Sequence, residues 1–311
     1  MNKVPMRDGY GQALLQMCAE RDDIMVLDAD VAKSTRSVWI RDKFPDKFLD
    51  MGICEQDMVG TAAGMALGGM IPFISTYCVF LAGRAWDQIR TTVCYNKLNV
   101  KFAGAHAGIS VGPDGATHQS LEDVALTRVL PGMTVVVPCD AEETRKATLA
   151  IAEINGPCFV RFGREAVPVV TDESTPFELG KARLVREGSD VTVFANGAMV
   201  YEATQAAEKL AAEGISVCVY DLHTIKPLDA EAIVAAAKKT GAIVTAEEHQ
   251  AAGGMGGAVA ECLALNCPVP MEMVAVQDSF GESGQPQELM DRYGLNADAI
   301  EAKIKAVLAR K

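Results

Sequence analysis

The sequence predicts an α/β protein with two doubly wound domains, each a mostly parallel sheet covered by helices on both faces. Short apolar runs of strand length alternate with stretches of helical periodicity along nearly the whole chain, and this alternation is typical of parallel sheets with helical crossovers. The second observation is a single interruption, a passage rich in proline and acidic residues at 166–180. We therefore expect a first domain at 1–165, a linker at 166–180 and a second domain at 181–311.

In the first domain, short apolar runs predict strands and apolar residues at helical spacing predict helices. The expected strands are residues 24–27, 72–75, 100–103, 134–137 and 158–161. The expected helices are residues 10–18, 56–68, 83–95, 121–128 and 141–155. Ser120 and Asp140 each precede an acidic residue by three positions, which predicts that they cap the last two helices.

The same reasoning divides the second domain. The expected strands are residues 191–195, 216–219, 242–245 and 272–276. The expected helices are residues 198–212, 229–239, 257–265 and an amphipathic C-terminal helix from Ala297, capped by Asn296.

Charge and hydropathy exclude two classes of partner. The chain has 311 residues, 49% of them hydrophobic, which is enough for a large core. Its formal net charge is −12, and no lysine and arginine cluster suits nucleic acid or an anionic membrane. No apolar run is long enough to span a bilayer, and the N-terminus lacks the apolar core of a signal peptide. We expect a cytoplasmic protein with neither nucleic acid nor membrane as a partner.

The nine cysteines form no C-x-x-C pair, and most fall inside expected helices or strands. This pattern favours buried free thiols in a reducing compartment over a disulfide framework or a zinc site.

A glycine-rich run at 253–257 follows an expected strand and opens a helix, as a dinucleotide-binding loop does. Val259 stands where the third glycine of that motif belongs. We therefore expect a tight turn with close helix packing there.

Residues 51–70 form the most unusual stretch of the chain. An expected strand end at 48–51 leads into a helix made almost entirely of glycine, alanine and methionine, with Glu55 and Asp57 as its only acids. So few large side chains allow another backbone to approach closely, which predicts that this helix packs inside a larger assembly. Glu55 is either a site carboxylate or a first-turn acid that complements the helix dipole.

Polar residues gather in the loop at 104–119, which follows an expected strand. His106, Asp114 and His118 lie there among glycines, and long irregular loops beyond strand ends are frequent places for function. Tyr77 and Phe80 follow the neighbouring strand at 72–75. Phe80 is either a ligand contact or ordinary core.

Several motifs together resemble the transketolase family and its thiamine-diphosphate-dependent relatives. The first domain, which is similar to the pyrimidine-binding domain of that family, contains G-I-C-E-Q-D-M, S-T-Y-C-V-F, H-A-G-I-S-V-G-P-D-G-A-T-H-Q and F-G-R-E in this order. The second domain, with E-E-H-Q-A-A-G-G-M-G-G and D-S-F-G-E-S-G, resembles the C-terminal domain of the family. The resemblance covers essentially the whole chain.

The resemblance implies roles for individual residues. Glu55 would hydrogen-bond the pyrimidine of thiamine diphosphate, Phe80 would stack on that ring with Tyr77 beside it, and Asp30 would lie near the cofactor. A substrate phosphate would contact Arg7, Ser34, His106 and Arg164. His118 and Asp114 would touch the reacting sugar hydroxyls, His118 with a catalytic role, and Arg84 is a further candidate for substrate binding.

The chain lacks the G-D-G motif and following asparagine with which the family binds the diphosphate and Mg²⁺. The resemblance therefore implies the C-terminal subunit of a split, two-chain transketolase. An N-terminal transketolase subunit would supply the diphosphate and magnesium site, and the working unit would be an α2β2 heterotetramer.

The implied activity is the transfer of a two-carbon ketol unit from a ketose phosphate to an aldose phosphate. Deoxyxylulose-phosphate synthases, the β subunits of 2-oxo-acid dehydrogenases and a non-catalytic assembly subunit are the alternatives. His106 lies eight residues before Asp114, which is the transketolase spacing. The pair of sugar substrates, the pathway and the identity of the partner remain open.

Overall fold

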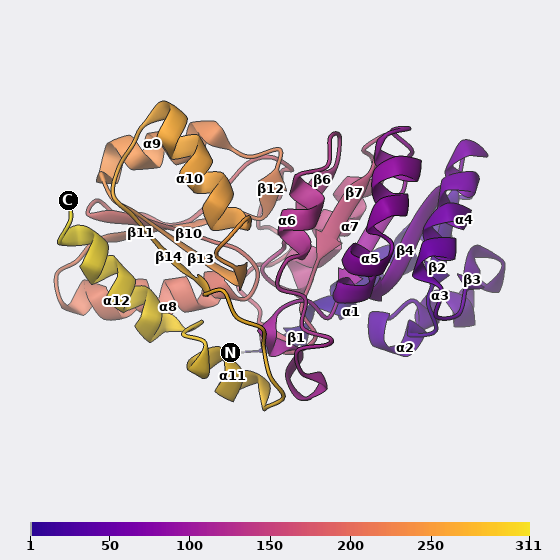
Figure 1. Ribbon diagram of the computed structural model, residues 1–311, viewed down its shortest axis with the longest axis horizontal. Coiled ribbons are helices and arrows are strands. Elements are labelled where there is room, and N and C mark those ends of the chain that lie inside the picture. The colour runs from indigo at the N-terminus through magenta and orange to yellow at the C-terminus, as the bar shows by residue number, and fades with distance from the viewer. Residues whose placement is uncertain (1) are drawn as a thin grey trace.

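The computed structural model describes residues 2–311, and these residues form a seven-stranded sheet, a five-stranded sheet and a two-stranded pair. The two large sheets lie side by side, each with helices on both faces (Figure 1). The predicted α/β class, with two mostly parallel sheets covered by helices, is confirmed.

The larger sheet has the strand order β12-β6-β7-β5-β4-β2-β3. Its strands are β2 (Ile24–Asp28), β3 (Phe48–Asp50), β4 (Ile71–Tyr77), β5 (Lys101–Ala105), β6 (Thr134–Val136), β7 (Cys158–Arg161) and β12 (Thr224–Lys226). All pair in parallel except β12, which runs antiparallel to β6 although it comes from the second half of the chain. Ser75 of β4 is in register with Asp28 of β2 and Ala103 of β5, so these strands end at one common edge.

Helices cover both faces of the larger sheet. The helical elements of this half are α1 (Met6–Glu20), α2 (Ala32–Thr35), α3 (Val38–Lys43), η1 (Pro45–Lys47), α4 (Glu55–Leu67), α5 (Cys78–Arg84), η2 (Gln88–Cys94), η3 (Ile109–Asp114), α6 (Asp123–Arg128) and α7 (Ala141–Ala152). On one face, α1 packs on α7, and residues such as Tyr10, Leu14 and Ile151 are buried with Phe73. On the other face, α4, α5 and η2 bury residues such as Met58 and Leu81.

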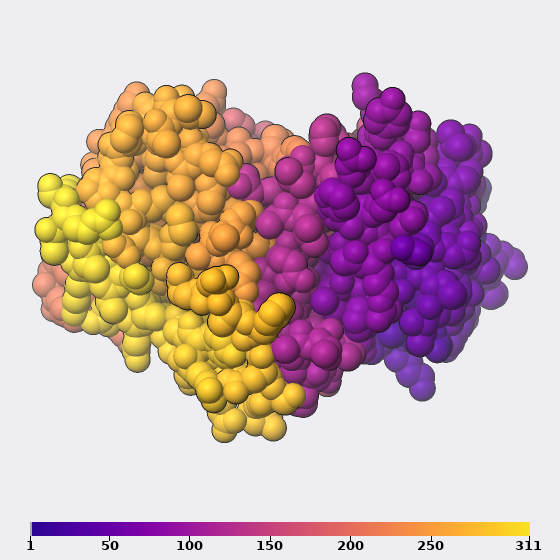
Figure 2. Space-filling model, viewed as in Figure 1, coloured from indigo at the N-terminus to yellow at the C-terminus, as the bar shows by residue number. Residues whose placement is uncertain are grey.

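The smaller sheet has the strand order β14-β13-β10-β11-β9. Its elements are β9 (Arg183–Arg186), β10 (Val191–Ala195), α8 (Met199–Ala212), β11 (Val217–Asp221), α9 (Ala230–Thr240), β13 (Ile243–Gln250), α10 (Met255–Asn266), β14 (Met271–Val276), α11 (Pro286–Arg292) and α12 (Ala297–Leu308). Helices α8 and α12 pack together on one face, and α9 and α10 pack together on the other (Figure 1). Helix α11 leaves this unit and packs on η3 of the first, where the yellow C-terminal segment meets the magenta part of the chain (Figure 2).

The predicted linker contains a short strand. Strand β8 (Ala166–Pro168) pairs antiparallel with β1 (Lys3–Pro5) near the N-terminus. Just beyond it, the backbone N–H groups of Val170 and Thr171 both donate to Asp140 Oδ2, at 2.7 Å. These long-range hydrogen bonds hold the segment against the first unit. No local sequence pattern predicts them.

One predicted helix is divided in the structure. Residues 83–95 were expected to form a single helix, but α5 ends at Arg84 and a π-helix, η2, follows. Leu81, Ala85, Ile89 and Val93 are all fully buried, and their spacing of four exceeds the 3.6 residues of an α-helical turn. A wider π turn keeps these residues on the sheet-facing side.

The predicted caps have mixed outcomes. Asp140 accepts from the Glu143 N–H and Asn296 from the Ala299 N–H, as expected. The Ser120 cap is wrong: α6 begins at Asp123, and Ser120 instead forms a parallel bridge with Ala107. The tertiary bridge takes precedence over the local capping pattern.

The run at 253–257 is the expected tight turn with close packing. Glu247 is buried and accepts from the N–H groups of Met255 and Gly256, both at 2.7 Å, at the start of α10. A Cβ on Gly256 would lie 2.8 Å from Thr245 Oγ1. The first turn of this helix is therefore closed by the protein's own carboxylate.

Every cysteine lies in the described chain and carries a free thiol, and seven of them are buried, as predicted. Cys139, Glu143 and Asp221 place possible metal ligands within 4.8 Å of one another. Arg183 already lies among them, with Nη2 2.9 Å from Asp221 Oδ2. We interpret this cluster as an ionic contact between the two units. Among the helices of residues 2–311, none combines the length and the apolar character needed to cross a membrane.

Candidate active site

The predicted site residues gather at the edge of the larger sheet where β2, β4 and β5 end. Asp30 follows β2, Tyr77 is the last residue of β4, and His106 directly follows β5. Because parallel strands all point the same way, their carboxyl ends bring these loops together.

Glu55 lies at the start of α4, as predicted, and its side chain is only 4% exposed. The positive end of the helix dipole favours a carboxylate at this position. Its partner is Arg84 at the end of α5, whose Nη1 lies 3.1 Å from Oε1 and 3.3 Å from Oε2. An open depression of about 730 Å³ at this point is lined by residues 53–57 and Arg84. A buried carboxylate therefore faces a space that a ligand can enter.

Four rings form a continuous group beside Glu55. The Tyr77 ring lies 4.4 Å from His106 and 6.1 Å from Phe80, measured between centroids. His118 meets Phe80 edge-on at 5.1 Å and Tyr77 at 6.1 Å. The structure thus joins the predicted aromatic pair to both predicted histidines, and Phe80 is only half-buried, unlike an ordinary core residue.

Three arginines act electrostatically on His106. The pKa of His106 is lowered to about 3, chiefly by burial and then by Arg7, Arg164 and Arg36, in that order. Burial also lowers the pKa of Arg7, with Arg36 as the next cause. Arg7 Nε and His106 Nδ1 are both buried and have no hydrogen-bond partner within residues 2–311. Arg36 and Arg164 each pair with an acid, Asp8 and Asp114, but the unused Arg7 Nε donor and the neighbouring cations make an environment that an anion would stabilise.

The remaining predicted substrate residues connect to this cluster. Ser34 links it to the rings, since its carbonyl accepts from Arg7 Nη1 at 3.1 Å and its hydroxyl accepts from the Tyr77 hydroxyl at 3.2 Å. Arg164 Nη1 lies 3.4 Å from Asp114 Oδ1 and donates to the Val111 carbonyl. His118 Nδ1 contacts the Thr117 hydroxyl at 2.8 Å.

Asp30 is the predicted residue that the structure leaves outside these contacts. It is exposed, with a φ of 59°, and its backbone N–H donates to Asp50 Oδ1. Asp28, two residues earlier, is the buried acid of this loop. Burial raises its pKa to about 6, while hydrogen bonds from Ser37, Thr35 and the Val31 N–H act in the opposite direction.

The second unit holds the loop that carries both histidines. Glu248 Oε1 accepts from the Ser110 N–H at 2.6 Å, and a Cβ on Gly108 would lie 2.3 Å from the same atom. Gln119 Nε2 donates to the Glu282 carbonyl at 2.9 Å. The loop is therefore positioned by contacts between the units.

Sequence reasoning missed two residues of this region, Arg36 and Glu248. Arg36 carries no motif, and its only sequence signal is its place two residues after Ser34. Glu248 lies in the E-E-H run that supports the family resemblance, but that run predicts no contact with a loop more than a hundred residues away.

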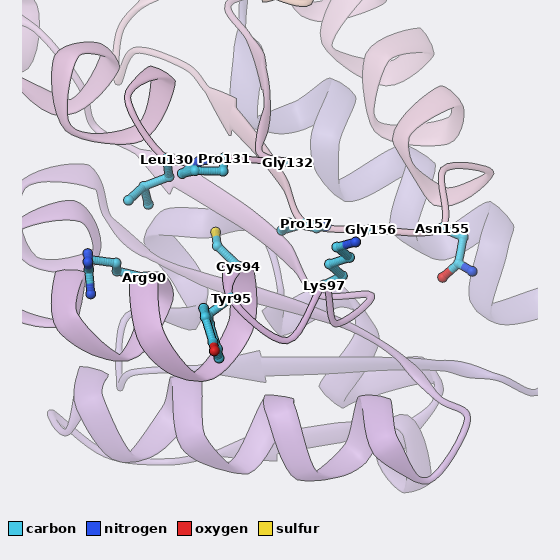
Figure 3. Close-up of a pocket in the computed structure, with 10 residues that line it drawn as sticks. All are labelled: Arg90, Cys94, Tyr95, Lys97, Leu130, Pro131, Gly132, Asn155, Gly156 and Pro157. Atoms are coloured by element: carbon cyan, nitrogen blue, oxygen red, sulfur yellow. The ribbon is translucent and has the colours of Figure 1, made fainter.

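A separate groove lies at the opposite edge of the larger sheet. It has a volume of about 410 Å³ and is shown with its lining residues in Figure 3. The lining consists of Arg90, Cys94, Tyr95, Lys97, Leu130, Pro131, Gly132, Asn155, Gly156 and Pro157. It contains no predicted site residue.

Comparison with known proteins identifies both units. The transketolase pyrimidine-binding domain family matches residues 2–170, and the transketolase C-terminal domain family matches residues 180–300.

Two relatives and one solved structure match this chain over nearly their whole length. The chain is 43% identical to the 6-deoxy-6-sulfo-D-fructose transketolase subunit SqwH of Clostridium sp. (strain MSTE9), over 98% of this chain and 95% of that protein. It is 38% identical to one subunit of the apulose-4-phosphate transketolase of Phocaeicola vulgatus, over 96% of each chain. A solved structure described as a split gene transketolase, inactive beta4 tetramer, superposes with a TM-score of 0.93 at 47% identity and covers 98% of this chain and 99% of its own. The chain therefore belongs to the transketolase family, as a split-transketolase-like C-terminal subunit.

Proposed function

We propose that this chain is the C-terminal half of a thiamine-diphosphate-dependent transketolase that moves a two-carbon ketol unit from a ketose phosphate to an aldose phosphate. The observation that carries the proposal is one juxtaposition. The buried Glu55 carboxylate and the Phe80 and Tyr77 rings lie at the same sheet edge as the arginine cluster around His106. The first group suits a cofactor pyrimidine, and the second suits a substrate phosphate.

The residues present fit the pyrimidine end of thiamine diphosphate. Glu55 offers a carboxyl group with little access to water, and the half-buried Phe80 and Tyr77 offer ring faces. When bound, thiamine diphosphate supplies the nucleophilic carbon that accepts the two-carbon unit. The role of Glu55 is to hydrogen-bond a pyrimidine nitrogen and to hold or release a proton there. The two aromatic rings orient the pyrimidine by stacking.

The arginine cluster fits the phosphate of the sugar. Arg7, Arg36 and Arg164 can each direct guanidinium donors at phosphate oxygens, and His106 stays neutral among them because it is buried. Holding this remote phosphate would orient the reacting end of the sugar toward His118 and Asp114. With Nδ1 engaged by Thr117, His118 keeps Nε2 for proton exchange with a substrate hydroxyl.

An N-terminal partner subunit would supply the diphosphate and Mg²⁺ site. The outer side of α4, next to Glu55, supports such a partner: Ile53 is 67% exposed and Leu67 is 76% exposed. A Cβ added to Gly60 or Gly64 would meet no atom within 4 Å in this chain. An exposed apolar and glycine-rich helix face beside a buried carboxylate suits close packing against another subunit. We expect an α2β2 assembly.

The test is to recover the chain with its partner from native cells and assay the complex with thiamine diphosphate, Mg²⁺, xylulose 5-phosphate and ribose 5-phosphate. Co-purification of a second chain and ketol transfer would support the proposal. An assembled complex that binds thiamine diphosphate but does not use these sugars would redirect the search to other sugar phosphates. If no partner is captured, the proposal that this chain is one half of a two-subunit enzyme fails.

A variant of the outer helix face sharpens this test. Gly60→Leu fills open space in the isolated chain, so the fold should remain intact while recovery of the partner is lost. Circular dichroism and sedimentation velocity separate these two effects. Undiminished assembly of Gly60→Leu would remove α4 from the proposed interface.

A further inference from the structure

We propose that Arg84 is a placeholder for the cofactor: in the chain without cofactor, its guanidinium occupies the position that the pyrimidine ring takes when it binds. This inference rests on the proposed function, because it assigns the pyrimidine to Glu55 and Phe80. It adds that cofactor binding is an exchange, in which the ring displaces the side chain of Arg84.

Arg84 makes both of the contacts that a pyrimidine ring would need. Its Nη1 lies 3.1 Å from Glu55 Oε1 and 3.3 Å from Oε2, where a ring nitrogen would meet the carboxyl group. Its Cζ lies 4.1 Å from the centroid of Phe80, over the face on which a ring would stack. A planar cation bonded to a carboxylate and stacked on an aromatic ring matches the polar edge and the flat face of an aminopyrimidine.

The side chain is free to leave. Arg84 is the last residue of α5, and its side chain is 52% exposed although Glu55 is only 4% exposed. Its backbone is held separately, because the Arg84 carbonyl accepts from Gln56 Nε2 at 3.1 Å. The guanidinium can therefore swing into the adjoining depression without disturbing the core.

The exchange has a physical reason. A buried carboxylate without a partner is costly, so Arg84 stabilises Glu55 until the pyrimidine binds. Once the guanidinium leaves, the Glu55 carboxyl group is free to hydrogen-bond a ring nitrogen. Arg84 would therefore stabilise the Glu55 carboxylate in the subunit without cofactor, and it would compete with the cofactor for the same position.

The experiment measures binding rather than turnover. The full chain is titrated with 4-amino-5-hydroxymethyl-2-methylpyrimidine, the pyrimidine portion of thiamine, by ligand-observed NMR. The assembled complex is titrated with thiamine diphosphate and Mg²⁺ by calorimetry. Arg84→Ala should bind both probes about tenfold more tightly than the wild type, the effect of removing one partly exposed ion pair with its cation–π contact. Arg84→Lys, which keeps the charge but loses the planar group, should fall between them.

Two controls separate the possible outcomes. Arg90→Ala removes an exposed arginine that lines the groove at the opposite edge and should leave both affinities unchanged. Adding Glu55→Gln to Arg84→Ala should abolish the gain. If Arg84→Ala binds as the wild type does, or more weakly, while Glu55→Gln weakens binding in the complex, the placeholder is refuted and the proposed function stands. If the complex does not bind thiamine diphosphate, the proposed function itself fails.

Discussion

Two opposite edges of the larger sheet, which share strand β5, differ in chemistry. At the edge where β2, β4 and β5 end, a buried carboxylate, four rings and three arginines meet. At the edge where β5, β6 and β7 begin, the groove of Figure 3 has a well-defined volume of about 410 Å³, but Arg90 and Lys97 are its only charged lining residues.

The difference teaches that the direction of the strands locates the predicted site residues better than the shape of a cavity does. Parallel strands present their carboxyl ends together, and the loops that follow them carry polar side chains to one place. The start of α4 adds its dipole to the same edge. The loops at the other edge connect helices to strands and close over the core. The presence of a well-formed apolar groove at that edge is therefore not evidence for a catalytic site.

The largest expected effect comes from substituting Glu55 at the edge where β2, β4 and β5 end. Glu55→Gln preserves the size of the side chain but removes the carboxylate, so exchange of the C2 proton of bound thiamine diphosphate should fall by about 10² or more. Exchange is followed by NMR in the assembled complex. The matched variant Tyr95→Ala at the groove should leave the exchange rate unchanged. Normal exchange in Glu55→Gln would remove Glu55 from the proposed role.

An intermediate effect is expected at the arginine cluster. Arg164→Ala removes a charged donor to the proposed phosphate, so KM for phosphorylated sugars should rise by about tenfold to a hundredfold. KM for hydroxypyruvate, a donor without phosphate, should change little. Lys97→Ala, a charge removed from the groove, serves as the control. Equal losses on both kinds of donor would contradict the phosphate assignment.

The smallest expected effect concerns the pH dependence of stability. His106 has a folded pKa of about 3 and an unfolded pKa of about 6.5. Between these values the unfolded chain binds the proton, so the wild type loses stability as the pH falls below about 6.5. His106→Asn lacks this titration, and asparagine tolerates the φ of 56° at this position.

The measurement is the free energy of unfolding in urea at pH 8 and pH 5. The value at pH 8 sets the baseline for each protein. Between the two conditions the wild type should lose about 2 kcal/mol more than His106→Asn. An identical loss in both proteins would show that His106 is not held neutral by its surroundings.

Local sequence patterns correctly predicted the elements that depend mainly on interactions within their own segment. The strands at 158–161 and 191–195 were predicted to the residue, and the caps Asp140 and Asn296 act as expected. Ser120 and the helix at 83–95 were predicted less well, because a bridge to Ala107 and the packing of a four-residue repeat on the sheet took precedence. In both cases the deciding contact lies outside the local segment.

The residues of the candidate site also fall into two groups, those that the sequence predicted and those that it did not. The motifs that contain Glu55, Phe80, His106 and His118 predicted a cofactor and substrate site through their resemblance to the transketolase family. Arg36 was not predictable, since its electrostatic effect on His106 depends on the packing of α2 against β4. Glu248 was not predictable either, because it contacts Ser110 across the boundary between the units.

The sequence by itself determined the α/β class, the family and the residues proposed to carry the chemistry, because hydrophobic periodicity and motif spacing are properties of short segments. Only the tertiary structure decided which groups those residues face. It placed Arg84 on Glu55, brought three arginines within electrostatic range of His106 and paired β12 with the first sheet. Ion pairs, burial and the pairing of β12 with the first sheet involve segments that are distant in the chain, so no local pattern predicts them.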